Sequence, residues 1–441
     1  MVDRNLGEEI PVSISPSRIR IGLVAALIGL AGFAAVASTS QAQMAGSFYQ
    51  AQVKAGKSKG AASKATKAAM KGVKGFYGFN LKAKDIPAKH GTLIWSKKGK
   101  NRPEAKSTDV VLYSSRSISG KKIAVSGTVM IPKKRMPKGG YPVITWAHGT
   151  VGLADPCAPS KFLNRTADYD YGSGELIGDW LAEGYAVVAT DYEGLGTPDI
   201  HPYLIGESEG RGVLDIVPAA RQLNSQISKK AVLAGHSQGG QAILFAASLA
   251  STWGKGINYL GTVSYAPASN FEFQAQNIGA LDGPGGPGIS ALAISIGRGM
   301  VAGNSSIKPA DVFTDQAMAF YPDTETLCYS DLAAKVVASG LQPSRLLKPN
   351  WANGTSSGRL FQQELIKQNP AVKVSAPVLI TQGTADTTVF ELITNRLVPQ
   401  IEAENAPGEI SYQKYDGADH GSILIQSKPA VDAFIKGLLA R

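Results

Sequence analysis

Short runs rich in valine and isoleucine recur along this chain, and several of them are separated by stretches with helical spacing. Most runs are continuous rather than strictly alternating, as buried strands of a parallel sheet tend to be. They lie at residues 125–132, 141–149, 185–192, 231–237, 259–267, 376–383 and 409–417. Helical patterns lie at residues 174–184, 210–226 and 239–252. Strands that alternate with helices predict an α/β fold with a mostly parallel sheet.

The alternation breaks once, over residues 268–375, where no clear strand pattern occurs. Loops of that length without structure are rare in compact domains, so we expect a folded, mainly helical insertion. Leu292, Ile296 and Met300 in this segment are spaced as on one face of a helix. Such a stripe either packs into a core or lines a lid, and both interpretations stay open.

The pattern G-x-S-x-G, typical of a nucleophilic serine on a strand-to-helix turn, occurs around Ser208, Ser237 and Ser356. Only the stretch "AVLAGHSQGGQAILFAASLAS" gives Ser237 an apolar strand before it, a helix after it and small neighbours. Ser208 lies between two glutamates, whose charges oppose an oxyanion, and Ser356 lies in the turn-rich run "NGTSSGR". We therefore predict Ser237 as the nucleophile; the alternative is a glycine-rich turn that only connects sheet and helix.

A serine needs a base to become a nucleophile. Among the histidines, His420 in "YDGADHGS" follows the last strand, where the base of such folds lies in chain order. Asp386 in "LITQGTADTTV" follows the penultimate strand and is the predicted acid that orients the imidazole. Asp419 competes only because it adjoins His420 in the chain. A structural surface histidine is the alternative at position 420.

An acyl-transfer site also requires donors for the oxyanion of the tetrahedral intermediate. The backbone N–H of Gln238, directly after the nucleophile, is the first predicted donor. The second is the N–H of Thr150, in the "HGT" segment that ends the strand "YPVITWAHG". Gly149 in that segment lets the backbone approach closely. Taken alone, "HGT" fits an ordinary tight turn equally well.

The N-terminus departs from the globular pattern. Arg18 and Arg20 precede an apolar run of 17 residues, which is followed by the small residues of "STSQAQ". This pattern predicts a signal peptide over residues 1–42 and hence a secreted or cell-envelope protein. An uncleaved membrane anchor is the alternative. Residues 43–75 contain seven lysines and no acid, which predicts a basic disordered segment before a domain at 76–441.

The net charge of +11 resides almost entirely in residues 43–110, and the remainder is close to neutral. No recognition motif accompanies these lysines, so nucleic acid is not expected as a partner. We expect a lipid–water interface or an anionic envelope polymer as a partner of the tail, or a tail that only solubilises the chain. Cys157 and Cys328 suit one disulfide of an exported protein, with two free buried thiols as the alternative.

Three stretches resemble the secretory lipases, exported α/β-hydrolases of the yeast lipase-A type. These are "AHGTVGLADPCAPS", "VVATDYEGLGTPDIHPYLIGESEG" and "GHSQGG". The resemblance covers roughly residues 75–441 and leaves out the lysine-rich tail. It implies an α/β-hydrolase fold, the triad Ser237, Asp386 and His420, a helical cap inserted before the acid, and hydrolysis of carboxylic esters including acylglycerols. It also favours a disulfide between the two cysteines.

The sequence therefore predicts an exported serine ester hydrolase, most simply a lipase, that needs no metal or cofactor. One alternative is an esterase for short soluble esters, and another is a peptidase or acyltransferase that uses the same triad. A third, from a different class, is an inactive hydrolase fold that binds the cell envelope through its basic tail.

Overall fold

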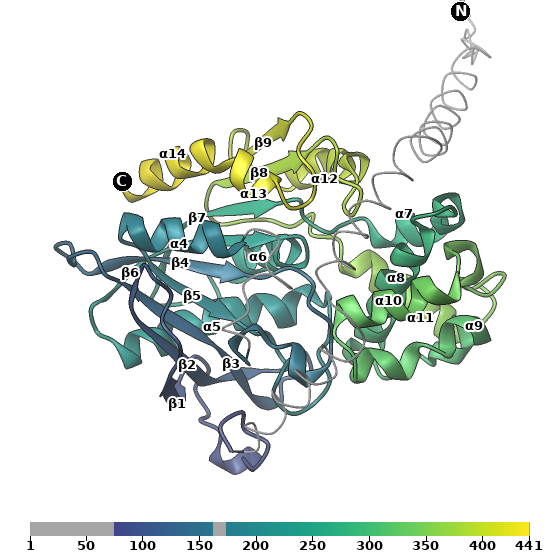
Figure 1. Cartoon of the computed structure of the whole chain (residues 1–441), viewed down its shortest axis with the longest axis horizontal. Coiled ribbons are helices and arrows are strands. Elements are labelled where there is room, and N and C mark those ends of the chain that lie inside the picture. Colours follow the sequence, from purple (N-terminus) through teal and green to yellow (C-terminus); the bar gives the residue numbers. More distant parts are fainter. Residues whose placement is uncertain (1–74, 162–172, 441) are drawn as a thin grey trace, which may run out of the picture.

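The computed structural model describes residues 75–161 and 173–440, so the predicted signal peptide and nearly all of the lysine-rich segment lie outside the described residues. Within them, one nine-stranded sheet is flanked by helices (Figure 1). The strands are β1 Leu93–Lys98, β2 Ala105–Arg116, β3 Lys122–Pro132, β4 Tyr141–Ala147, β5 Ala186–Thr190, β6 Ile227–His236, β7 Asn258–Tyr265, β8 Val378–Gly383 and β9 Ile410–Tyr415. The helices are α4 Ser173–Glu183, α5 Gly206–Leu223, α6 Gln238–Leu249, α7 Phe271–Gln276, α8 Gly286–Gly303, α9 Asp315–Met318, α10 Tyr329–Ser339, α11 Ser356–Lys367, α12 Glu391–Ala403, α13 Ile423–Gln426 and α14 Lys428–Leu439.

The strand order across the sheet is β1-β2-β3-β5-β4-β6-β7-β8-β9. Pairing is parallel from β5 through β9 and antiparallel from β1 through β3 and on to β5. The predicted α/β fold with a mostly parallel sheet is confirmed. The sequence prediction missed β1 and β2, the antiparallel edge.

Two apolar cores sandwich the sheet, because side chains alternate between the faces of each strand. In β4, Val143 contributes to the core beneath α5, α6 and α12, and Ile144 and Trp146 contribute to the core beneath α4, α13 and α14. Each fully buried side chain of this size contributes about 1.5–3 kcal/mol. This double coverage explains why the central strands read as continuous apolar runs.

Helices α7 to α11 come between β7 and β8 and form a group to one side of the sheet (Figure 1). They share an apolar core of their own, which also receives Tyr203 and Leu204 from the loop before α5. Met300 on α8 is buried in that core, and Leu292 and Ile296 are partly buried against it. Among the described residues, no helix combines the length and the apolar character needed to cross a bilayer.

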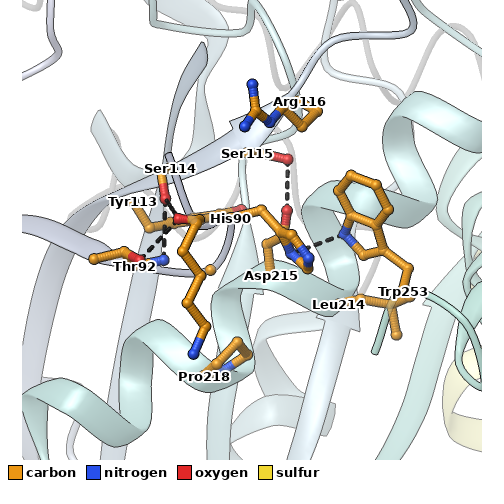
Figure 2. A network of polar contacts seen from close by, with 12 residues as sticks. His90, Thr92, Tyr113, Ser114, Ser115, Arg116, Leu214, Asp215, Pro218 and Trp253 are labelled. Carbon is orange, nitrogen blue, oxygen red and sulfur yellow. Dashed lines mark hydrogen bonds and ion pairs between the residues drawn. The ribbon is translucent and has the colours of Figure 1, made fainter. Parts of the chain in front are cut away.

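A polar network ties the N-terminal segment to α5 (Figure 2). The buried carboxylate of Asp215 lies 2.5 Å from Nδ1 of His90 and accepts hydrogen bonds from Ser115 Oγ at 2.6 Å and Trp253 Nε1 at 2.9 Å. The His90 ring stacks on the Trp253 ring, with centroids 4.1 Å apart. Every polar atom of this carboxylate is therefore satisfied inside the fold, which is what a buried acid requires. The network has a structural role: it fastens the segment before β1 onto the sheet.

Candidate active site

Ser237 occupies a sharp turn between β6, which ends at His236, and α6, which begins at Gln238. Its backbone has φ of 59° and ψ of −116°, a region that non-glycine residues avoid at a cost of about 1–3 kcal/mol. The surrounding structure holds this conformation, since Ser237 N–H donates to the Tyr265 carbonyl and its own carbonyl accepts from Ala268 and Gln241. The turn has the geometry of a nucleophile elbow.

Two glycines make the elbow possible. A Cβ placed on Gly239 would collide with the Ala147 carbonyl, and one placed on Gly235 would collide with the Gly239 carbonyl. Both collisions involve backbone atoms, which cannot rotate away as a side chain can. The small residues that the sequence shows around Ser237 are therefore required by close packing of β4, the turn and α6.

Asp386 and His420 form a buried pair at the ends of neighbouring strands. Nδ1 of His420 lies 2.7 Å from Oδ2 of Asp386. The other oxygen, Oδ1, accepts the N–H groups of Thr388 at 2.8 Å and Val389 at 2.9 Å. Because the loop after β8 fixes the carboxylate this firmly, the carboxylate can fix the orientation of the imidazole in turn.

His236 connects the elbow to the loop that carries His420. Its Nε2 lies 2.7 Å from the His420 carbonyl oxygen, and the two rings lie 4.4 Å apart between centroids. Burial holds the pKa of His236 well below its usual range, so the ring is neutral and donates Nε2–H to that carbonyl. The residue directly before Ser237 is thus bonded to His420, which brings the predicted nucleophile and base to the same edge of the sheet.

The segments that carry the predicted oxyanion donors adjoin the elbow. A Cβ on Gly149 would lie 3.6 Å from the Ser237 Cβ, so the "HGT" segment after β4 runs beside the serine. Thr150 in that segment is buried, and its Oγ1 lies 2.6 Å from the Tyr203 hydroxyl. Gln238 is the first residue of α6, where backbone N–H groups have no partner within the helix and favour negative charge.

The competing candidates have structural roles. Ser208 lies in α5 and donates to the Glu193 carboxylate, and Ser356 begins α11, where Thr355 caps the helix by accepting Gly358 N–H. Asp419 points its carboxylate at its own turn, accepting the N–H groups of Gly421 and Ser422. The ring of His420 is held by Asp386 and not by its neighbour in the chain.

An apolar pocket opens among the helices after β7. It encloses about 640 Å³, counting the solvent at its mouth. Leu292 and Ile296 of α8 line it, so this stripe faces the pocket while Met300 completes the helical core. Thr388 and Phe390 also line it, and they lie two and four positions after Asp386 in the chain. The pocket therefore extends from the helical group to the loop that holds the acid.

Cys157 and Cys328 form a disulfide, as the resemblance favoured. It joins the loop after β4 to the start of α10, beside a bridge between Gly152 and Cys328 and a hydrogen bond from Tyr329 N–H to the Val151 carbonyl. The loop that carries Thr150 is thereby fastened to the helical group. No cluster of three or more histidine, cysteine or acidic side chains suited to a metal occurs within residues 75–161 and 173–440.

The side chains that support the predicted oxyanion donors were not among the residues that the sequence pattern indicates. Gln238 Nε2 bonds Glu209 Oε1 at 2.8 Å and lies 3.0 Å from His201 Nε2, and Tyr203 holds Thr150. The stretch "HPYLIGESEG" excludes Ser208 as the nucleophile and contributes to the family resemblance, but neither property indicates a role for His201, Tyr203 or Glu209. The available signal is the pair Glu207 and Glu209, which the sequence presents only as charges that oppose an oxyanion. In the structure Glu209 is fully buried, whereas the Glu207 side chain is 40% exposed and pairs with Arg211.

Comparison with known proteins gives one family. The model of the family described as "Secretory lipase" matches residues 173–437. Lipase A of Moesziomyces aphidis is 29% identical over 158 residues, which cover 34% of this chain and 32% of that protein, so the chain spans about a third of this curated relative.

Solved structures share the fold at low sequence identity. An esterase of Xanthomonas oryzae, described as a rice cell wall degrading esterase, superposes with a TM-score of 0.64 at 20% identity and covers 80% of this chain and 99% of that one. Lipase A of Candida antarctica in its closed state superposes with a TM-score of 0.63 at 20% identity and covers 82% of this chain and 86% of that one. These likenesses confirm the α/β-hydrolase fold, and the family match is the stronger finding. The chain belongs to the secretory lipase family.

Proposed function

We propose that this protein is a serine carboxylic-ester hydrolase that acts as a lipase on acylglycerols. The observation that carries the proposal is the buried hydrogen bond between the His420 ring and Asp386. The carbonyl of the same His420 is bonded to His236, the residue directly before Ser237 in the strained elbow. Membership of the secretory lipase family supports the same reaction. A hydroxyl, an imidazole and a carboxylate in this chain order are what acyl transfer requires.

In the proposed reaction, Ser237 Oγ attacks the ester carbonyl while Nε2 of His420 accepts the hydroxyl proton. Asp386 keeps the proton on Nδ1 and stabilises the imidazolium. The N–H groups of Gln238 and Thr150 stabilise the oxyanion, which is commonly the largest electrostatic contribution to such catalysis. His420 then protonates the departing alcohol, and water hydrolyses the acyl-enzyme by the same steps in reverse.

The apolar pocket favours a fatty acyl chain over a short acyl group. Its lining is almost entirely aliphatic and aromatic, including Phe271, Phe313 and Phe361. At about 25 cal/mol per Å², each methylene of a chain that enters such a pocket contributes about 0.8 kcal/mol to binding. An esterase restricted to short soluble esters would gain little from this lining.

Hydrolysis of p-nitrophenyl esters tests the proposal. The purified protein should hydrolyse butyrate through palmitate esters, with kcat/KM that does not fall as the chain lengthens. Ser237→Ala should abolish turnover. Ser356→Ala, in the G-x-S-x-G pattern that begins α11, should leave turnover unchanged. Turnover that disappears beyond butyrate would favour the short-chain esterase, and an inactive wild type would favour a binding protein on a hydrolase fold.

We further propose that residues 1–42 direct export and are removed, that residues 43–75 form a basic tail, and that residues 268–375 act as the cap of the domain at 76–441. The family name and the disulfide favour an exported protein. Sequencing the N-terminus of the protein from culture medium tests this proposal. A chain that begins near residue 43 supports it, and an intact chain retained in the membrane fraction contradicts it.

A further inference from the structure

We propose that Glu209 is a positioning residue that holds both oxyanion donors of the elbow in place. The inference rests on the proposed function and adds to it a residue from the G-x-S-x-G pattern around Ser208, whose serine is not the nucleophile. The two donors, Thr150 and Gln238, come from different loops, 88 positions apart in the sequence. A single segment, residues 201–209, contacts both of them.

The carboxyl group of Glu209 is the centre of these contacts. It lies on the first turn of α5 and is fully buried. Its Oε1 accepts a hydrogen bond from Gln238 Nε2 at 2.8 Å and another from the backbone N–H of Leu204 at 2.8 Å. One oxygen atom therefore joins the residue after the nucleophile to the loop before α5.

The histidine beside this carboxyl group has a defined tautomer. His201 Nδ1 lies 2.8 Å from the Glu193 carbonyl oxygen, which can only accept, so Nδ1 carries the proton. Burial lowers the pKa of His201 to about 3, which leaves Nε2 as an acceptor. The amide group of Gln238 donates one hydrogen to His201 and the other to Glu209. Both hydrogens of this amide are satisfied, and these two bonds hold the Gln238 side chain at the start of α6 in place.

The second donor is held through the backbone that Glu209 stabilises. Leu204 has φ of 61°, a left-handed conformation that a leucine adopts only when its surroundings impose it. Its N–H reaches Glu209, and the neighbouring Tyr203 places its hydroxyl 2.6 Å from Thr150 Oγ1. The Leu204 carbonyl also accepts a hydrogen bond from Gln241 Nε2 at 3.1 Å. Loss of the Glu209 contact therefore removes the bond that holds the Leu204 N–H and loosens the neighbouring Tyr203 hydroxyl.

The site favours a neutral acid. Burial raises the pKa of Glu209 to about 8, and its Oε2 has no hydrogen-bond partner among the described residues. The titratable groups that face it are His201, which is neutral and whose Nε2 lies 3.5 Å from Glu209 Oε1, and Tyr192, whose pKa is raised by burial and further by the charge of Glu209. No cation is among these groups. A negative charge formed here above pH 8 would lie behind the oxyanion donors and oppose the charge that they stabilise.

Steady-state kinetics of substitutions at Glu209 test the inference. Loss of a whole oxyanion donor costs about 100- to 1,000-fold in kcat, so a loosened pair should cost about tenfold or more. Glu209→Leu should lower kcat by that amount with KM within about twofold. Glu209→Gln keeps an acceptor for Gln238 and Leu204, so it should retain the wild-type kcat at pH 7 and escape the decline that the wild type shows above about pH 8.

Two further variants keep the test decisive. Tyr203→Phe removes the hydroxyl that is bonded to Thr150 and keeps the aromatic ring, so it creates no large cavity. This variant should lower kcat and leave KM unchanged. Asp215→Asn changes another buried acid of α5 whose partners belong to the network of Figure 2, and should leave kcat and its pH profile unchanged.

The possible outcomes separate the inference from the proposed function. Wild-type kcat in Glu209→Leu and in Tyr203→Phe would overturn the positioning role, and so would an alkaline decline that persists in Glu209→Gln. If Glu209→Leu does not fold, Tyr203→Phe and the pH profile of Glu209→Gln decide. A wild type and an Asp215→Asn variant that both fail to hydrolyse any ester would refute the proposed function itself, and the positioning role with it.

Discussion

The disulfide should carry a large share of the stability of the domain. Replacing Cys157 and Cys328 together by alanine opens a covalent loop that joins residues 171 positions apart. The chain-entropy model assigns a loop of this length about 5 kcal/mol at 25 °C. Whole domains are stable by about 5–15 kcal/mol, so the expected loss is a substantial fraction of the total. Both sulfurs lie in an apolar cluster with Val151, Ala154 and Leu195, so alanine leaves no unsatisfied polar group.

Urea denaturation followed by tryptophan fluorescence measures this loss. The double alanine variant should unfold at a lower urea midpoint, with a free energy of unfolding about 3–5 kcal/mol below that of the wild type. Reductant should move the wild type toward the variant and leave the variant unchanged. Equal midpoints for the two proteins, or a wild type that is insensitive to complete reduction, would refute the reasoning.

The disulfide also bears on the site, because the loop that it anchors begins beside Thr150. The backbone bond between Tyr329 and Val151 and the bridge between Gly152 and Cys328 lie next to it. We therefore expect the double variant to lose esterase activity at urea concentrations below those at which its tryptophan fluorescence changes. Loss of activity and fluorescence at the same concentration would indicate that the loop has no independent freedom.

Three further predictions concern the site and its surroundings. Asp386→Asn should lower kcat by about 10⁴-fold, because an amide favours the wrong tautomer of His420, while the melting temperature stays within a few degrees; kinetics and thermal unfolding check it. Gly239→Ala should lower the free energy of unfolding in urea by about 1–3 kcal/mol, because the new Cβ would meet backbone atoms. Gly437→Ala is the control, since a Cβ there meets nothing within 4 Å. Equal effects of the two substitutions would contradict the packing argument. Leu292→Trp should fill the pocket and lower kcat/KM for palmitate esters relative to butyrate esters; an unchanged ratio would exclude the pocket as the acyl site.

The central sheet could be predicted because its physical cause is visible in short windows of sequence. Strands covered by helices on both faces need apolar side chains at every position, and such runs stand out. Strand β2 could not be recognised in this way, because Ser114, Ser115 and Asp109 interrupt its apolar pattern. These residues are buried, but partners far along the chain satisfy them; Asp215 accepts from Ser115, for example. Edge strand β1 is mostly exposed, and its apolar residues are limited to the first three, Leu93 to Trp95.

The candidate site likewise has residues that the sequence predicts and contacts that it does not. Ser237, Asp386 and His420 each follow a strand, so local patterns and chain order were sufficient to select them; their catalytic roles stay predictions. The contacts that hold the oxyanion donors depend on the positive φ of Leu204 and on pairs of residues separated by tens of positions, such as Tyr203 with Thr150. Neither the backbone conformation of Leu204 nor these long-range contacts can be recognised in a short window of sequence. The sequence predicts a helix at 210–226, whereas α5 spans Gly206–Leu223. The earlier start has a related reason: Ile205 before the helix provides no side-chain cap, and Glu209 inside it accepts the Leu204 N–H instead.

Trapping of the acyl-enzyme tests the central claim most directly. The protein is mixed with a p-nitrophenyl ester, quenched in acid within the first turnover and digested for mass spectrometry. We predict one acyl group per chain on the peptide that contains Ser237, none in Ser237→Ala, and greatly slowed formation in His420→Ala. An acyl group on any other residue, or full turnover by Ser237→Ala, would contradict it.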